Sequence, residues 1–233
     1  MVNLAVVYYS STGATYALAA ASAAVAEKLG AEVRLRRVAE LDPGAAAASR
    51  SGSSEHRTAT EHVPVAEAAD LDWADAILIG SPVHFGLAAP AVMQFINTTS
   101  ALSVAGKLST KVVSAFATAS APHGGQVSTI LALHNAICHW GSIIIATGST
   151  AGVLFKPHNG NPYGASSTGA VHEENLEAIE FQTERTIAVA AAVLRGGLEP
   201  VIATAADTAD DTTADTADET TVDTTAGTPA ETA

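Results

Sequence analysis

Small hydroxyl side chains and a glycine cluster in one segment close to the start of the chain. The segment consists of Ser10, Ser11, Thr12, Gly13, Ala14 and Thr15. It follows an apolar run and precedes a stretch of strong helix formers, so its backbone N–H groups would point at one place that suits an anion. The segment has no Lys or Arg, and it matches neither the Gly-Lys-Ser/Thr ending of a triphosphate loop nor the Gly-x-Gly-x-x-Gly pattern of a dinucleotide loop. These residues predict a site for a monophosphate held by neutral donors, with a plain helix cap as the alternative.

Two later loops have compositions that suit a flat ligand. The first brings an aromatic ring and backbone amides together, and it contains Pro82, Val83, His84, Phe85 and Gly86. The second is rich in small residues, whose backbone can approach a ligand closely, and it contains Ala119, Ser120, Ala121, Pro122, His123 and Gly124. The alternatives are an ordinary turn with Phe85 in the core and an ordinary tight turn before a helix.

The elements that must position these loops alternate between apolar runs and helical stretches, which is typical of βαβ units and a parallel sheet. We predict strands at residues 4–9, 32–38, 75–80, 111–118 and 142–147, and helices at residues 14–29, 90–98, 126–140 and 173–194. This pattern predicts an α/β fold with a doubly wound, five-stranded parallel sheet in the order 2-1-3-4-5. In such sheets ligands bind beyond the carboxyl ends of the strands, at the point where the strand order reverses, and there the three loops would meet.

The remaining segments are predicted to lie at the surface or to pack without a chemical role. Residues 42–70 contain Pro, Gly, Ser and Thr and are interpreted as a long surface excursion, in which His56 and His62 are solvated. The single cysteine, Cys138, excludes an intrachain disulfide and is interpreted as a small buried residue rather than a reactive thiol. His134 and His139 are five residues apart, too far round a helix to share a metal ion, so no metal site is predicted.

Charge divides the chain into two parts. Residues 203–233 consist almost wholly of Ala, Thr and Asp, and their eight acids account for eight of the thirteen net negative charges, leaving −5 for residues 1–202. We predict one domain over residues 1–202 and a disordered acidic tail over residues 203–233. A body without a basic stripe argues against nucleic-acid binding. With no charged leader and no apolar run long enough to span a membrane, we expect a cytoplasmic protein.

Across residues 3–195 the chain resembles the WrbA-type NAD(P)H:quinone oxidoreductases of the flavodoxin superfamily. The segments that carry the resemblance are residues 8–13, 80–82, 85–86, 90–95, 123–126, 129–131, 139–141, 161–166 and 181–182. The Gly-Gly-Gln block at 124–126 and the Pro-Tyr-Gly-Ala block at 162–165 are more specific to this family than to flavodoxins at large.

The resemblance implies a flavodoxin-like homotetramer with FMN at each switch point. By position, residues 10–15 would bind the FMN phosphate, residues 82–86 would flank the flavin, and residues 119–124 would line its other side. His139 would lie near the flavin or reach a neighbouring subunit, with a helix-terminal histidine as the alternative. The chain departs from the family at three places, where Thr12, His84 and Ser103 replace an aromatic residue, an Arg and a Trp, and these departures concern the substrates more than FMN.

The function predicted from these features is an FMN-dependent oxidoreductase that takes hydride from NADH or NADPH and reduces quinones by two electrons. The flavin performs the chemistry and the protein positions it. Three histidines are candidate proton donors because histidine titrates near neutral pH, with His139 ranked first, ahead of His84 and His123. The alternatives are a flavodoxin-like electron carrier and an FMN-binding, redox-responsive interaction protein.

Overall fold

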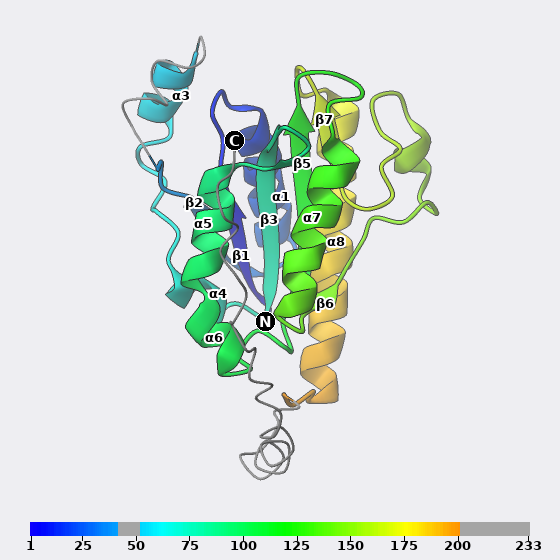
Figure 1. The fold of residues 1–233 in the computed structure, drawn as a ribbon. Helices are drawn as coiled ribbons and strands as arrows, with labels where there is room; N and C mark the ends of the chain where they lie inside the picture. The colour runs from blue at the N-terminus through cyan, green and yellow to red at the C-terminus, as the bar shows by residue number, and fades with distance from the viewer. Residues whose placement is uncertain (42–51, 201–233) are drawn as a thin grey trace, which may run out of the picture. The chain divides into compact units, whose positions relative to one another are not determined.

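A parallel sheet with helices on both faces forms the described part of the chain, which is residues 1–41 and 52–200 of a computed structural model (Figure 1). The predicted acidic tail and the first part of the predicted surface excursion lie outside these described residues. Five strands make the main path of the sheet, in the order β2-β1-β3-β5-β6. They are β2 (Glu32–Arg37), β1 (Asn3–Tyr8), β3 (Ala76–His84), β5 (Val112–Ala119) and β6 (Ile143–Ile144). The predicted α/β fold and its 2-1-3-4-5 order are confirmed, because β5 and β6 are the fourth and fifth strands of this path.

The fifth position of the sheet differs from the prediction of one strand over residues 142–147. The strand β6 pairs only with the start of β5, and a further short strand, β7 (Ser166–Thr168), pairs in parallel with its end. Between them the side chain of Gln182 bonds to β5, where its Nε2 donates to the carbonyl of Ala115 at 2.8 Å. A buried amide therefore satisfies the middle of β5, where a continuous fifth strand would otherwise do so.

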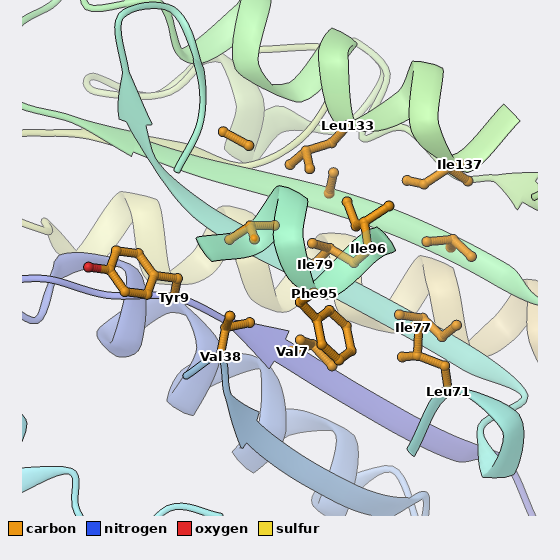
Figure 2. Close-up of a cluster of buried hydrophobic side chains, with 14 of the residues drawn as sticks. Val7, Tyr9, Val38, Leu71, Ile77, Ile79, Phe95, Ile96, Leu133 and Ile137 are labelled. Atoms are coloured by element: carbon orange, nitrogen blue, oxygen red, sulfur yellow. The ribbon is translucent and has the colours of Figure 1, made fainter. Parts of the chain in front are cut away.

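The central strand β1 is buried on both faces, as its unbroken apolar run predicts. Ala5 and Val7 belong to one hydrophobic cluster and Leu4 and Val6 to the other, since successive side chains of a strand point to opposite faces. Figure 2 shows the first cluster, in which Val7 lies among side chains from several other elements. The sheet is thus the rigid centre on which the loops are mounted.

Four helices cover the two faces of the sheet (Figure 1). The helices α5 (Pro90–Thr98) and α7 (Gln126–His139) contribute to the cluster of Figure 2. The helices α1 (Ala14–Lys28) and α8 (Glu173–Gly196) contribute to the cluster on the other face. Each lies within two residues of its predicted bounds, because helix formers fill all four and glycine or proline marks their ends.

The shorter elements correct several predictions. The excursion contains a helix, α3 (Ser53–Ala59), and the start of another, α4 (Ala68–Trp73). His62 is exposed as predicted, but His56 on α3 is half-buried. Two more elements were not predicted, namely the hairpin strand β4 (Leu87–Ala88) and the helix α6 (Ser100–Val104). A 3₁₀ turn, η1 (Gly152–Phe155), lies between β6 and β7.

Cys138 is exposed, so its interpretation as a buried residue was wrong. The inward face of α7 is taken by Ile130, Leu133 and Ile137, and Cys138 lies one residue further round the helix. Among the described helices, none combines the length and apolarity that a membrane span requires.

Candidate functional site

The three predicted loops meet in one cleft of about 240 Å³ at the carboxyl ends of β1, β3 and β5. Nine of the predicted residues line it, namely Ser10, Ser11, Thr12, Ala14, Thr15, Pro82, Val83, Ala119 and Ser120. Two lining residues, Thr118 and Gly169, were not predicted. Thr118 could have been found, because it ends a predicted strand at the switch point, whereas Gly169 follows the unpredicted strand β7. The lining contains no charged side chain.

The first loop has the backbone of an anion site. Gly13 adopts φ 107°, a left-handed conformation that side-chain-bearing residues rarely take, and it immediately precedes α1. The Gly13 N–H donates to Ser10 Oγ at 3.1 Å, and no side chain caps the start of α1. The alternative of a plain hydroxyl cap is therefore not what this loop forms, and the helix N-terminus faces the cleft without a side-chain acceptor.

A buried pair of hydroxyls fixes this loop to the sheet. Thr15 and Thr118 are almost fully buried, and their Oγ1 atoms lie 2.8 Å apart in a hydrogen bond. Because Thr15 is in the first turn of α1 and Thr118 is near the end of β5, the bond crosses the floor of the cleft. One hydroxyl must donate and the other accept, so each keeps a capacity to bond to a polar ligand.

The second loop turns sharply after β3. Pro82 and Val83 line the cleft, but Phe85 has a φ of 53° and is fully exposed, so it is neither a core residue nor a wall of the cleft within one chain. Gly86 approaches the third loop, and its carbonyl accepts a hydrogen bond from Ser128 Oγ at 2.9 Å. His84 is half-buried and, like Phe85 and Gly86, does not belong to the cleft lining.

The side chain of Gln126 anchors the third loop through two hydrogen bonds. Gln126 Nε2 donates to the Ala121 carbonyl at 3.0 Å and to Thr168 Oγ1 at 2.8 Å. A Cβ on Gly124 would lie 2.6 Å from Ala119 Cβ, so the turn needs glycine there. Ala119 and Ser120 face the cleft, while the rest of the predicted set, residues 121–124, makes the turn beyond it and exposes His123.

His139 lies at the other end of the molecule from the cleft. The helix α7 begins next to the third loop and runs for 14 residues, about 21 Å, to His139 (Figure 1). The His139 side chain is exposed in a shallow groove that also contains Ser103 and Trp140. Within one chain the structure therefore does not bring His139 to the three loops, and it places Ser103 beside His139 instead of beside the cleft.

A second cavity, of about 280 Å³, shares Ser10 and Ser11 with the cleft and lies on the β2 side of the first loop. We call it the cationic pocket, and its lining is Tyr8, Tyr9, Ser10, Ser11, Arg37, Val38, Ala39, Glu40, Ser53, His56, Arg57 and Thr60. Sequence reasoning missed it, although Arg37 and Glu40 flank the end of a predicted strand at the correct edge of the sheet.

Hydrogen bonds and ring contacts order the walls of the cationic pocket. The Tyr9 hydroxyl donates to a Glu40 carboxylate oxygen at 2.8 Å, and Figure 2 shows this hydroxyl pointing away from the labelled hydrophobic side chains. The His56 ring packs at a tilt on Tyr16 with 5.7 Å between ring centroids, and burial lowers the pKa of His56. Burial also raises the pKa of Tyr9. The His56 Nδ1 atom lies 3.5 Å from the place of a Cβ on Gly13, so this histidine backs the first loop.

Comparison with known proteins gives consistent similarities. The family described as NADPH-dependent FMN reductase matches residues 3–152. A protein of Deinococcus radiodurans named NAD(P)H dehydrogenase (quinone) is 39% identical over 196 residues, which cover 83% of this chain and 98% of that protein. A protein of the same name from Geobacter sulfurreducens is 37% identical over 207 residues, covering 83% of this chain and all of the relative.

Among solved structures, a flavodoxin, WrbA-like protein from Agrobacterium tumefaciens superposes with a TM-score of 0.59. The two sequences are 22% identical, and the match covers 82% of this chain and 99% of the other. At that identity the superposition supports the fold alone, which is flavodoxin-like.

Proposed function

Because the chain belongs to the NADPH-dependent FMN reductase family, we propose that it is an FMN-dependent NAD(P)H:quinone oxidoreductase that binds FMN in the cleft. The observation that carries this proposal is the meeting of the three loops, from β1, β3 and β5, around one uncharged cleft. The relatives that share about two fifths of their residues with this chain over nearly their whole length are named for the same activity.

The residues of the cleft fit FMN. A phosphate would be held by the N-terminus of α1 and by the hydroxyls of residues 10–15, since a helix start without a side-chain cap favours an anion. The Thr15–Thr118 pair offers polar contacts where a ribityl chain would cross the floor of the cleft. The volume of about 240 Å³ is below the range of pockets that enclose a whole drug-sized ligand, so part of the isoalloxazine ring would remain accessible to substrates.

When it is bound, FMN supplies the two-electron chemistry, and the side chains of the protein bind and orient. Val83 and Ala119 line the cleft with small apolar side chains, which would contact a flat ring. The described lining of the cleft contains no charged group, so the phosphate would be bound by neutral donors alone. No side-chain nucleophile would be required, because the bound cofactor would supply the redox chemistry.

We further propose that the chain functions as a homotetramer, as its resemblance to the WrbA-type enzymes implies. Exposed apolar side chains on the β4 hairpin and α7 support burial between copies, namely Phe85, Leu87, Val127 and Leu131. His139 keeps its proposed catalytic role only through such an assembly, in which it would reach the cleft of another copy. We also place the protein in the cytoplasm, which its single cysteine supports, since no intrachain disulfide is possible.

The test is a spectrum followed by turnover. The purified protein is expected to show flavin absorption bands, to lose them on addition of NADH or NADPH, and to regain them on addition of benzoquinone. Sustained turnover at ordinary enzyme rates, about 1 to 10³ per second, separates this function from an electron carrier or an interaction protein. A colourless protein that takes up no FMN would overturn the proposal.

A further inference from the structure

The end of β7 forms part of the cleft, although β7 is a short strand beside the main path of the sheet. It has three residues, and among the described strands it pairs only with β5. Gly169, which follows β7, lines the cleft with a φ of 66°, and its N–H donates to the Ala119 carbonyl at 2.7 Å. One wall of the cleft therefore depends on how a three-residue strand is held against β5.

A side chain of α7 makes a second connection between β7 and the third loop. Gln126 is the first residue of α7, and only 7% of it is exposed. Its Nε2 atom carries two N–H donors, one of which bonds to the Ala121 carbonyl at 3.0 Å and the other to Thr168 Oγ1 at 2.8 Å. Both donors of one planar amide are used, so this group constrains the separation between the third loop and β7.

The register of β7 directs Thr168 toward Gln126. Thr168 lies opposite Ala119 in the parallel pairing, and paired residues of neighbouring strands point to the same face of a sheet. Ala119 alternates in step with Ala115 and Ala117, which belong to the cluster of Figure 2 on the α7 side. The Thr168 hydroxyl thus lies on the face that α7 covers, where the Gln126 amide can donate to it.

The Ala121 carbonyl is fully used within the third loop. It accepts the Gly124 N–H at 3.0 Å as well as the Gln126 amide. A backbone carbonyl oxygen has two lone pairs, so neither remains for a ligand. A Cβ on Gly124 would lie 2.8 Å from this oxygen, which shows how tightly the turn closes around it. The Gln126 amide therefore orients a peptide group of the turn that follows Ser120.

Ser128, in the same turn of α7, holds the second loop less strictly. Its Oγ lies 2.9 Å from the Gly86 carbonyl and 3.0 Å from the Gly125 carbonyl, and its single proton can be donated to only one of them at a time. The second loop also packs directly on the helix start, because a Cβ on Gly125 would lie 2.8 Å from Gly86 Cα. Gln126 is therefore the side chain of this turn whose loss should change the cleft most.

We propose that Gln126 is a positioning residue for FMN, which acts through Thr168 to hold Gly169 and the third loop at the separation that the cofactor needs. This inference rests on the proposed function, since it takes the cleft to hold FMN. Gln126 does not line the cleft, so it would act through its two partners. A residue that only stabilises the fold would lower the free energy of unfolding without changing FMN affinity.

The test is a double-mutant cycle on FMN binding, measured by fluorescence quenching of the apoprotein. Gln126→Leu removes both donors at similar size and is expected to raise the FMN dissociation constant about tenfold. Thr168→Val removes the acceptor, keeps the β-branched shape and is expected to raise this constant several-fold. Thr168→Ser keeps the hydroxyl and should bind FMN like the wild type.

The double variant shows whether the two residues act through one bond. It should bind FMN at most about twofold more weakly than Gln126→Leu alone, because the second substitution has no bond left to remove. If the effects of Gln126→Leu and Thr168→Val multiplied in full, Gln126 would not act through Thr168, and the inference would be overturned.

Thr183→Val is the matched control for the loss of a buried hydrogen bond. Thr183 on α8 is fully buried, and its Oγ1 lies 2.8 Å from Ser22 Oγ on α1. Urea unfolding of the apoprotein is expected to show lower stability for this variant, with an FMN dissociation constant within about twofold of the wild type. If Thr183→Val weakened FMN binding as much as Gln126→Leu does, general destabilisation would explain both, and the positioning role would be wrong.

The outcomes separate failure of this inference from failure of the proposed function. If Gln126→Leu does not fold, Thr168→Val on a half-buried residue decides, and unchanged FMN affinity in that variant overturns the inference. If the wild-type protein takes up no FMN, the proposed function itself fails. If the wild type binds FMN and both single variants bind it equally well, only the positioning role of Gln126 is lost.

Discussion

The cleft and the cationic pocket share two serines but differ in the chemistry of their linings. The described lining of the cleft has a helix N-terminus and hydroxyls without a charged residue, whereas Arg37, Arg57, His56 and Glu40 line the pocket. A resident cofactor needs directional donors that hold it through many turnovers. A co-substrate must enter and leave each time, and fixed charge increases its rate of encounter. On the proposed function, the neutral side of the loop would hold the phosphate of the bound cofactor.

The largest effect is expected when a negative charge is introduced into the neutral cleft. Thr12 lines the cleft but not the pocket, and it is exposed, so Thr12→Asp should fold normally. A carboxylate beside the phosphate is expected to weaken FMN binding about a hundredfold, because like charges a few ångströms apart near a protein surface repel by a few kcal/mol. The measurement is the FMN dissociation constant, obtained by fluorescence quenching of the apoprotein.

The control for this prediction is Thr12→Asn, which has the size of Asp without its charge. Its FMN affinity should stay within about tenfold of the wild type, the range of one neutral hydrogen bond. If Asp and Asn weakened FMN binding equally, shape and not charge would govern the cleft, and the phosphate would not lie at Thr12.

A change in salt concentration tests the difference between NADPH binding and FMN binding without any substitution. Between about 20 and about 200 mM salt the Debye length falls from roughly 20 Å to below 10 Å, so attraction between fixed and mobile charges weakens. KM for NADPH is expected to rise several-fold over this range, while the FMN dissociation constant changes less than about twofold. Steady-state kinetics and apoprotein titration measure the two quantities.

The charge of the co-substrate, and not a general effect of salt on the protein, must cause this rise. KM for an uncharged quinone should therefore be insensitive to salt over the same range. An equal salt dependence of FMN and NADPH binding would contradict the distinction between the two cavities.

The features that could be predicted are those whose sequence pattern lies within a few neighbouring residues. The apolar run of β1 indicates burial on both faces, and the segment from Ser10 to Thr15 indicates a loop that enters a helix and lines a cleft, because each pattern is complete within a few residues. The order of the sheet followed from the alternation of strands and helices. The bounds of α5, which starts with Pro90, agree with the prediction to the residue.

The features that escaped prediction depend on residues far apart in the chain. The interruption of the fifth strand depends on Gln182, which comes from α8 and bonds to Ala115 in β5. The lining of the cationic pocket combines Arg37 of β2 with Arg57 of α3, which are twenty residues apart in the chain. Phe85 was assigned to a wall from its residue type and from the resemblance, whereas within one chain it has a positive φ and is fully exposed. The role of His139 stays a prediction, since it depends on a second copy of the chain.

The smallest expected effect concerns pH and the histidine behind the first loop. Burial lowers the pKa of His56 below the ordinary 6.5, so the unfolded chain binds more protons than the folded chain in the range just below that value. The stability that neutral His56 provides is complete above pH 6.5 and is lost as the pH falls through the lowered pKa. His56→Gln should therefore flatten the decrease in unfolding free energy between about pH 7.5 and pH 5, measured by urea unfolding.

His134 on α7 serves as the comparison for His56, because burial lowers the pKa of His134 as well. It belongs to a different helix from the one that packs behind the first loop. His134→Gln should remove its own share of the pH dependence and leave FMN and NADPH binding unchanged. His56→Gln should remove a similar share and also weaken FMN binding, since the His56 Nδ1 atom lies 3.5 Å from the place of a Cβ on Gly13 and so backs the first loop. If the two variants affected FMN binding alike, His56 would be only a packed side chain without influence on the first loop.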